Sequence, residues 1–505
     1  MNRIFRYAAM LLLIIGSASL VSCGEVEPEN IVTEEVQVAL SVDPASISFT
    51  AEGGFESVLV DTDAQEWDFM VAASWLEVEK YDDGFIVNAP SYDGDKARNG
   101  DIIVYAFTGN VREELILKVT QEAPAGSSTV TPEGVIAFEC PEFKIYAVEA
   151  CDVDGDGEVT PEEASRVTDL VLTYDVENTE INKITSLKGI EYFVNLVNLD
   201  CDLNALTSLD LSGLKKLEYV DCTYNQITSL NVSGCESLKW LYFYSNNVSE
   251  VNINGCVALQ FIQGYKNNVK RMDVSGLNEL VYFDMRLNSL TDLKIADCPK
   301  LNIIAVGDNN LASIDLTGLP ALYTLGCYSN SISSLDLSSL PELEMLECYN
   351  NNLASLDLSS NPKVTMLTCQ NNMISDLSMS SCILMKKLDC SGNRLTGSLD
   401  VSAFTDMYAF ACGGNRISSL NISGCTKLVE FACDNTDLVS VDVSIAPGLE
   451  SFICNDSMFE ILDVSANRSL TKLYAQGNPL TSLILAQGQT IKDLKLDNHD
   501  VISYK

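Results

Sequence analysis

The sequence contains almost no histidine and few basic residues. One histidine occurs among 505 residues, and 31 lysines and arginines stand against 71 aspartates and glutamates, giving a formal net charge of −40. A chain this acidic repels nucleic acid at long range, so we expect no nucleic-acid partner. The lone His499 lacks nearby partners for a Ser-His-Asp or Cys-His arrangement. No G-x-G-x-x-G or Walker loop opens a helix and no carboxylate pair stands out, so the sequence predicts a protein that is not an enzyme.

The apolar run near the N-terminus is short. Arg3 and Arg6 precede an apolar stretch from Tyr7 to Ile15, which is too short for a membrane span and is typical of an export signal. The stretch "LVSC" that follows resembles the lipobox of bacterial lipoproteins. This resemblance implies a signal peptide over residues 1–22 and a lipid anchor at Cys23, and Gly24 then favours the outer membrane, facing either outward or inward. The alternative is a cleaved secretory signal with an incidental cysteine.

A β-rich segment follows an acidic stretch. Residues 23–36 lack periodicity, so we expect a flexible stalk, and residues 38–123 alternate apolar and polar side chains, which predicts a β-sandwich. The blocks "ISFTAEGG", "EWDF", "SWLEV", "ARNGDIIV" and "LKVTQEA" resemble the BACON domain, an immunoglobulin-like module of exported Bacteroidetes proteins. That resemblance implies carbohydrate binding or a spacer role, with Trp67 and Trp75 as sugar contacts or core aromatics. A polar linker is expected over residues 124–135.

The stretch "DVDGDGEVTPEE" has the spacing of an EF-hand calcium loop. Its oxygen donors suit a hard cation, and carboxylates this close together repel one another without one. Short helices are expected on both sides, so residues 136–175 are predicted to form an EF-hand-like cap with a structural Ca²⁺ ion. The expected ligands are Asp152, Asp154, Asp156, Glu158, Thr160 and Glu163. Glu158, at the seventh loop position, would contribute its backbone carbonyl.

Residues 176–505 repeat with a period of 21. An asparagine, here called the register asparagine, recurs at this spacing from Asn204 to Asn393, and one step of 22 leads to Asn415. The surrounding pattern L-x-x-L-x-L/C-x-x-N-x-L is the leucine-rich repeat signature. One turn cannot bury its own leucines, so about 16 turns are expected to stack into a solenoid with a parallel β-sheet. Segments such as "TSLDLSGLKKL" resemble bacterial repeats of the internalin and Bacteroides surface-antigen kind.

The 17 cysteines follow the repeat. Fourteen of them lie three residues before or ten residues after the register position, where the consensus places inward apolar residues. Neighbouring strands about 4.8 Å apart hold parallel Cβ atoms too far apart for a disulfide, and the array has no CxxC pair or histidine partner for a metal. We therefore expect buried thiols. A bridge between Cys140 and Cys151 is left open.

The positions two, four and six before the register asparagine are expected to face outward on the concave side. They concentrate aromatic residues on neighbouring turns, and exposed apolar patches commonly mark interaction sites. Tyrosine and tryptophan suit protein hot spots and sugar stacking; alternatively, these aromatics simply favour strands and pack on one another. The candidate ligand-binding residues are Tyr219, Trp240, Tyr242, Tyr244, Phe261, Tyr265, Tyr282, Tyr328 and Tyr349.

These features together predict a multidomain, lipid-anchored binding or adhesion protein of the cell envelope. It is expected to recognise a protein or glycoprotein through the concave face of its repeats. The alternatives are a carbohydrate-binding component of a polysaccharide-capture system and a structural envelope scaffold. The sequence leaves the ligand and the oligomeric state open.

Overall fold

The computed structural model divides the chain into two compact units, Met1–Ser128 and Thr129–Lys505. The structure describes residues 39–122 apart from 52, 65, 72, 74, 82, 92–97, 109 and 110, and then residues 134–174 and 182–505. The predicted signal peptide, the stalk with Cys23 and most of the predicted linker lie outside the described residues. Among the residues that are described, no helix combines the length and the apolarity needed to cross a bilayer.

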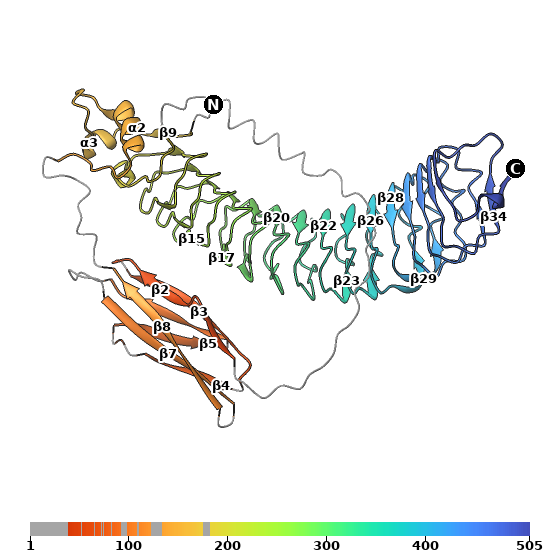
Figure 1. Cartoon of the computed structure of the whole chain (residues 1–505), viewed down its shortest axis with the longest axis horizontal. Coiled ribbons are helices and arrows are strands. Elements are labelled where there is room, and N and C mark those ends of the chain that lie inside the picture. The colour runs from red at the N-terminus through yellow and green to blue at the C-terminus, as the bar shows by residue number, and fades with distance from the viewer. Residues whose placement is uncertain are drawn as a thin grey trace. The chain divides into compact units, whose positions relative to one another are not determined.

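The first unit consists of two four-stranded sheets packed face to face (Figure 1). Apolar residues of both sheets share one core, in which Phe85 and Ile102 are fully buried. Trp67 and Trp75 pack against this core, each beneath a cationic side chain. This arrangement agrees with the predicted sandwich, whereas the resemblance to a BACON domain stays a prediction. In sheet order the strands are β1 (Leu40–Asp43), β3 (Gly54–Thr62), β6 (Gly84–Ala89) and β5 (Glu77–Tyr81), then β2 (Ser46–Phe49), β8 (Val111–Gln121), β7 (Arg98–Thr108) and β4 (Glu66–Val71).

The second unit is a curved solenoid with one 16-stranded parallel sheet along its concave side (Figure 1). Successive strands pair in register, so that Tyr219 lies opposite Trp240 and Trp240 opposite Phe261. Equivalent positions of neighbouring turns therefore form rows along the sheet. The strands are β9 (Asp169–Val171), β10 (Asn198–Asp200), β12 (Tyr219–Asp221), β14 (Trp240–Tyr242), β16 (Phe261–Gln263), β18 (Tyr282–Asp284), β20 (Ile303–Ala305), β21 (Thr324–Gly326), β22 (Met345–Glu347), β24 (Met366–Thr368), β26 (Lys387–Asp389), β28 (Ala409–Ala411), β30 (Glu430–Ala432), β31 (Ser451–Ile453), β33 (Lys472–Tyr474) and β35 (Asp493–Lys495).

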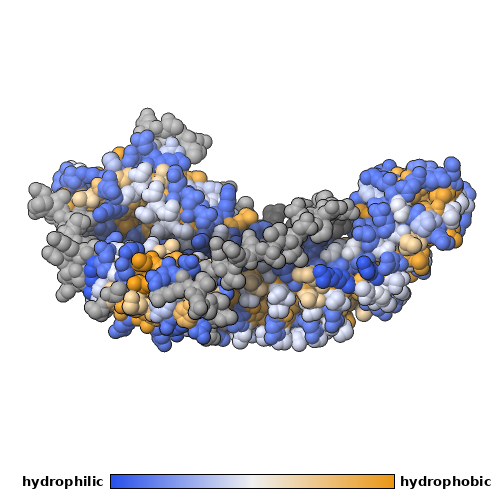
Figure 2. All heavy atoms as spheres, turned by 60° about the horizontal axis from the view of Figure 1, so that its bottom comes forward, coloured by the Kyte–Doolittle hydropathy of each residue, from blue (hydrophilic) through white to orange (hydrophobic). Residues whose placement is uncertain are grey.

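The outer side of the solenoid carries shorter parallel ladders of two or three strands. On the face seen in Figure 2, hydrophobic residues form small areas among hydrophilic ones. Several lysines on this unit pair with acids one turn away, as Lys215 does with Glu236 at 2.8 Å and Lys300 with Glu279 at 2.7 Å. Such exposed pairs add little stability. The ladders contain β11 (Ser208–Asp210), β13 (Ser229–Asn231) and β15 (Glu250–Asn252); β17 (Arg271–Asp273) and β19 (Asp292–Lys294); β23 (Ser355–Asp357) and β25 (Asp376–Ser378); β27 (Thr396–Asp400) and β29 (Arg416–Asn421); β32 (Ile461–Asp463), β34 (Ser482–Leu485) and β36 (Ile502–Tyr504).

Helices occur at the two ends of the solenoid. Two short α-helices, α2 (Pro141–Cys151) and α3 (Pro161–Ala164), precede β9, and Phe143 of α2 is buried in the same core as the repeats. The 3₁₀ turns are η2 (Ile190–Tyr192) and η3 (His499–Val501). Because β9 already belongs to the large sheet, the sheet begins inside the segment predicted as a cap.

The register asparagines form a ladder that joins adjacent turns. The buried Asn351 is representative: its Oδ1 accepts from Ile332 N at 2.9 Å, and its Nδ2 donates to Cys327 O at 3.0 Å and Cys348 O at 3.1 Å. Each amide thus satisfies backbone groups that no water reaches. This explains why the 21-residue spacing of asparagine is kept through most of the array.

The cysteines are free and buried among the described residues, as predicted. Burial raises the pKa of the Cys222 thiol well above its ordinary value and that of Cys256 to about 11, so both stay neutral. Side chains ten residues after the register asparagine also donate hydrogen bonds to backbone carbonyls. The Cys256 thiol donates to Val232 O at 3.0 Å, and Asn467 makes the equivalent bond at its own turn.

Candidate functional site

A row of tyrosines with one arginine follows the position two before the register asparagine. The rings of Tyr244 and Tyr265 stack with centroids 4.5 Å apart and planes 7° apart. The guanidinium carbon of Arg286 lies 5.9 Å from the Tyr265 centroid. Tyr328 and Tyr349 form a second stack at 4.6 Å and 4°. We call these five residues the tyrosine–arginine row.

Gly307 allows the two stacks to meet at Arg286. The Tyr328 ring lies across Gly307, where an added Cβ would come within 2.4 Å of Tyr328 Cζ. Burial raises the pKa of the Tyr328 hydroxyl, and the Arg286 guanidinium acts on it in the opposite direction. A side chain at position 307 would displace the ring, so the glycine makes the row continuous.

An ion pair holds Arg286 in the row. Its Nε donates to Asp284 Oδ1 at 2.9 Å, and its second terminal nitrogen donates to Asp284 Oδ2 at 2.6 Å. The Asp284 side chain is 1% exposed. A carboxylate buried this deeply is costly unless it is paired, and the two-point contact fixes the plane of the guanidinium. Arg286 is therefore oriented before any ligand binds.

The remaining candidate aromatics lie on strands β12 to β18, and one of them corrects the prediction. Tyr219 and Tyr242 meet edge to face with centroids 5.7 Å apart, and Trp240 and Phe261 are half-buried on the neighbouring strand positions. Tyr282, expected on the exposed surface, is buried instead, and its hydroxyl donates to Asp284 Oδ2 at 3.4 Å. Tyr282 therefore supports the ion pair through its hydrogen bond to Asp284 and does not present its ring to a ligand.

Acidic side chains border the aromatic face at its N-terminal end. Carboxylate oxygens of Asp200, Asp202 and Asp221 lie within 4.8 Å of one another. Burial raises the pKa of Asp221 to about 7, although Thr223 donates to its Oδ1 from both the backbone nitrogen at 3.1 Å and the hydroxyl at 2.8 Å. This end of the face therefore carries negative charge that depends on pH near neutrality.

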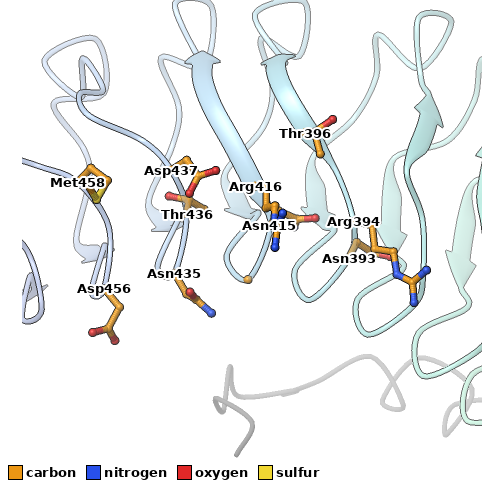
Figure 3. A pocket seen from close by; sticks show the side chains of 11 residues that line it. Asn393, Arg394, Thr396, Asn415, Arg416, Asn435, Thr436, Asp437, Asp456 and Met458 are labelled. Carbon is orange, nitrogen blue, oxygen red and sulfur yellow. The ribbon is translucent and has the colours of Figure 1, made fainter. Parts of the chain in front are cut away.

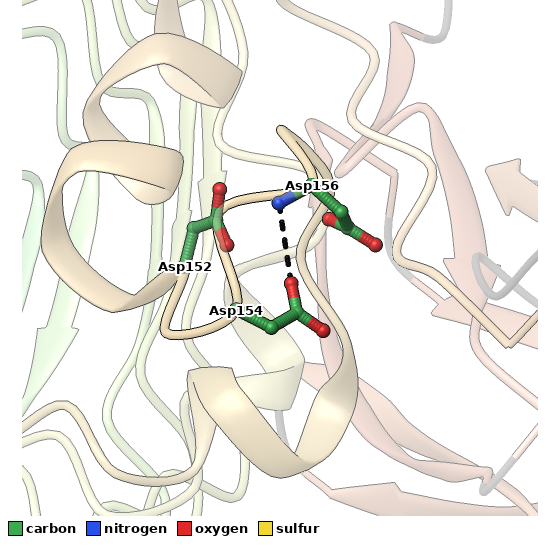
Figure 4. A group of neighbouring side chains, drawn as sticks. All are labelled: Asp152, Asp154 and Asp156. Atoms are coloured by element: carbon green, nitrogen blue, oxygen red, sulfur yellow. Dashed lines mark hydrogen bonds between the residues drawn. The ribbon is translucent and has the colours of Figure 1, made fainter.

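The loop predicted to bind calcium has the expected local form. Carboxylate oxygens of Asp152, Asp154 and Asp156 lie within 4.8 Å of one another, and the backbone nitrogen of Asp156 donates to Asp154 Oδ1 at 3.2 Å (Figure 4). Gly157 has a φ of 79° and donates from its nitrogen to Asp152 Oδ2 at 2.9 Å. A side chain at this left-handed position would be strained, which explains the glycine at the turn.

The later positions of the loop build the start of α3. Thr160 caps the helix by accepting from Glu163 N at 3.3 Å, while Glu163 Oε2 accepts from Thr160 N at 2.9 Å. Glu163 Oε1 also accepts from Val153 N at 3.1 Å, and the Glu158 side chain pairs with Lys144 at 2.7 Å. Glu163 thus closes the loop onto the helix and lies outside the group of three aspartates.

A second row, which the sequence reasoning missed, adopts left-handed backbone. The residue before the register asparagine has a positive φ on turn after turn, a conformation that costs most L-residues about 1–2 kcal/mol. Glycine, asparagine and aspartate adopt it most readily, and they dominate the C-terminal turns. That preference before each asparagine was the available signal. The row consists of Leu203, Tyr224, Ser245, Lys266, Leu287, Asp308, Ser329, Asn350, Asn371, Gly392, Gly414, Asn435, Asp456 and Gly477.

Comparisons with known proteins bear on the fold of the second unit. No family model and no curated protein matches the chain. Among solved structures, the functional domain of InlJ from Listeria monocytogenes, described as including a cysteine ladder, is 24% identical over 71% of this chain and 76% of its own, with a TM-score of 0.57. The leucine-rich effector protein YopM from Yersinia pestis is 21% identical over 66% and 89%, with a TM-score of 0.53. The solenoid is a leucine-rich repeat fold.

Two hollows lie beside the asparagine ladder of the leucine-rich repeats. One, of about 420 Å³, is lined by Tyr224, Lys266 and their neighbours and adjoins the aromatic face. The other, of about 650 Å³, lies near the 22-residue turn and is lined by Arg394 and Arg416 as well as Asp437. Figure 3 shows the side chains of this second hollow spread over successive turns without converging on one point. Of these two hollows, the first adjoins the aromatic face and thus belongs to the candidate site.

Proposed function

We propose that this protein is a binding or adhesion protein that recognises a protein ligand through the concave face of its leucine-rich repeats. The tyrosine–arginine row carries this proposal. Tyrosine and arginine are enriched at the energetic centres of protein interfaces, and the stacked rings lose little conformational entropy when they are covered. The row is half-buried, continuous and anchored by an ion pair, so it offers a rigid surface to a partner.

Glycan recognition is the second candidate. The paired parallel rings of the row suit stacking on a sugar face, and the neighbouring carboxylates of Asp200 and Asp202 accept hydrogen bonds from hydroxyls. The protein ligand is favoured because the aromatic surface runs over several turns along the solenoid. A polypeptide can cover this length, whereas a single sugar cannot.

The attachment and the location of the protein belong to the same proposal. The lipobox resemblance at Cys23 supports a lipid anchor, and Gly24 supports an outer-membrane position. More than one acyl chain gives a stable tether, at roughly 0.8 kcal/mol for each buried methylene. An anchored solenoid would present its concave face to molecules at the cell envelope.

We also propose that the loop from Asp152 to Glu163 holds a structural Ca²⁺ ion. The three converging aspartates and the left-handed Gly157 fit a hard cation. The ion would be held by Asp152, Asp154 and Asp156, with oxygens of Glu158, Thr160 and Glu163 completing the set. Its charge would offset the mutual repulsion of the carboxylates and tie α2 to α3 at the start of the sheet.

Binding measurements with matched variants test the concave face. The purified chain would be screened against a panel of purified glycoproteins and a glycan array, and each binder would be measured again with Tyr244→Ala and Tyr265→Ala. We expect a loss of affinity of about a hundredfold for protein binders. Tyr408→Ala, whose ring is exposed elsewhere on the solenoid, is the control and should bind normally. Binding that survives both row variants would refute the proposal.

A further inference from the structure

The hollow beside the aromatic face lies at the edge of the sheet where the strands end. Its lining includes Lys183, Leu203, Tyr224 and Lys266, together with ladder asparagines. Its volume is about 420 Å³, and it is widely open to solvent. Tyr224 meets Tyr244 edge to face with centroids 5.4 Å apart. The hollow is therefore continuous with the tyrosine–arginine row.

Large residues occupy the N-terminal end of the row with left-handed backbone, and Leu287, outside the hollow, is one of them. Leu203, Tyr224 and Lys266 all have φ between 52° and 59°, where a bulky side chain is strained. The turns from Asp308 onward place mainly aspartate, asparagine and glycine at the same position. Tyr224 nevertheless presents 50% of its surface to solvent. Strained positions that keep large exposed side chains are typical of binding sites.

Two lysines, Lys183 and Lys266, line the hollow. Neither Lys183 nor Lys266 forms an ion pair within the part of the chain that the structure describes, and the Lys183 ammonium lies 5.1 Å from the Tyr174 ring. Several lysines elsewhere on the solenoid, among them Lys215 and Lys300, pair with acids one turn away. In a chain of net charge −40, two such lysines beside one hollow favour an acidic group of a ligand.

We propose that this edge hollow binds a peptide segment of the partner protein, with an apolar side chain against Leu203 and Tyr224 and a carboxylate at Lys183 and Lys266. This inference rests on the proposed function, because the hollow extends the same face. The partner is therefore expected to carry an aromatic or aliphatic residue close to an aspartate or glutamate. The remainder of the segment runs onto the stacked tyrosines.

A displayed library of random peptides provides the probe. Peptides are selected on the purified chain, and their affinities are measured by calorimetry for the wild type, Tyr224→Asn, Lys266→Gln and the control Leu287→Asn. Asparagine adopts the left-handed conformation readily, so Tyr224→Asn should keep or raise the Tm while weakening binding about tenfold. Lys266→Gln should weaken binding about fivefold and reduce its dependence on salt. Leu287→Asn lies on the same row outside the hollow and should bind within about twofold of the wild type.

The outcomes separate this inference from the proposed function. Enriched peptides without an acidic residue, or normal binding by both Tyr224→Asn and Lys266→Gln, would overturn the edge site. If Tyr244→Ala still abolishes binding in that case, the concave-face function stands. Selective binding of acidic sugars on a glycan array, with no peptide enriched, would also overturn the peptide assignment. If Tyr224→Asn lowers the Tm, its weaker binding could reflect a disturbed fold. The affinity of Lys266→Gln, at an exposed side chain, then decides the result.

Discussion

The buried carboxyl of Asp221 makes the stability of the solenoid depend on pH. Burial raises its pKa from 3.8 to about 7, so the folded chain binds a proton at Asp221 up to about pH 7 whereas the unfolded chain releases it near pH 4. Between these values the folded state binds more protons, and its stability therefore falls as pH rises. The substitution Asp221→Asn removes this penalty because an amide does not ionise. The Oδ1 atom of the asparagine can still accept the two hydrogen bonds that Thr223 donates.

The size of the effect follows from the shift. A difference of about 3 pKa units corresponds to about 4 kcal/mol at most, since one unit is 1.36 kcal/mol. At pH 5, about 1.2 units above the ordinary pKa of 3.8, Asp221 is protonated in the folded state but ionised in the unfolded chain, so about 1.6 kcal/mol of this difference already applies. At pH 8 it applies in full. We therefore expect the stability that Asp221→Asn gains over the wild type to be about 2.5 kcal/mol larger at pH 8 than at pH 5.

Thermal unfolding followed by circular dichroism at pH 5 and pH 8 measures this difference, with calcium held constant. The exposed Asp437→Asn is the control, and its Tm should differ from the wild type by the same small amount at both pH values. The reasoning is refuted if the Tm gained by Asp221→Asn is equal at pH 5 and pH 8. A lower Tm for the variant at pH 8 would also contradict it.

Three further predictions concern the cap, the ladder and the thiols. Chelation of calcium should lower the Tm of the wild type but leave that of Asp154→Asn unchanged, and equal shifts in the two would contradict a calcium site in the loop. Asn351→Ala should cost roughly 3 kcal/mol, because several buried hydrogen bonds of about 1 kcal/mol each are lost; Asn352→Ala, on the surface, should cost under about 0.5 kcal/mol in a urea titration. A thiol reagent should label none of the buried repeat cysteines in the native chain and all of them in guanidinium, whereas rapid native labelling would contradict their burial.

The repeat and its faces were predictable because they depend on spacing alone. A period of 21 with leucine at fixed offsets determines which side chains point inward, so the free buried thiols followed without a model of the core. The same register placed Tyr244, Tyr265, Tyr328 and Tyr349 on the concave face. The loop from Asp152 was predicted for a similar reason, since its donors lie at fixed spacings within one short stretch of sequence.

Other features depend on contacts between side chains of different turns. The burial of Tyr282 and the orientation of the Tyr328 ring across Gly307 arise from how neighbouring rings and glycines share space. The position of a residue within the repeat predicts the face toward which its side chain points, but it does not predict the rotamer. The rotamers decide which rings stack. The donor role of the Cys256 thiol likewise required the position of a carbonyl on the preceding turn.

The sequence by itself determined the solenoid, its two faces, its asparagine ladder and the candidate calcium loop, because each is encoded by residues at fixed separations. The tertiary structure alone decided that the tyrosines form a continuous row through Arg286, and that Tyr224 and Lys266 line one hollow. Those features arise where side chains and carbonyls of stacked turns meet at a few ångströms. Such packing depends on side-chain volume and rotamer, which periodicity does not specify.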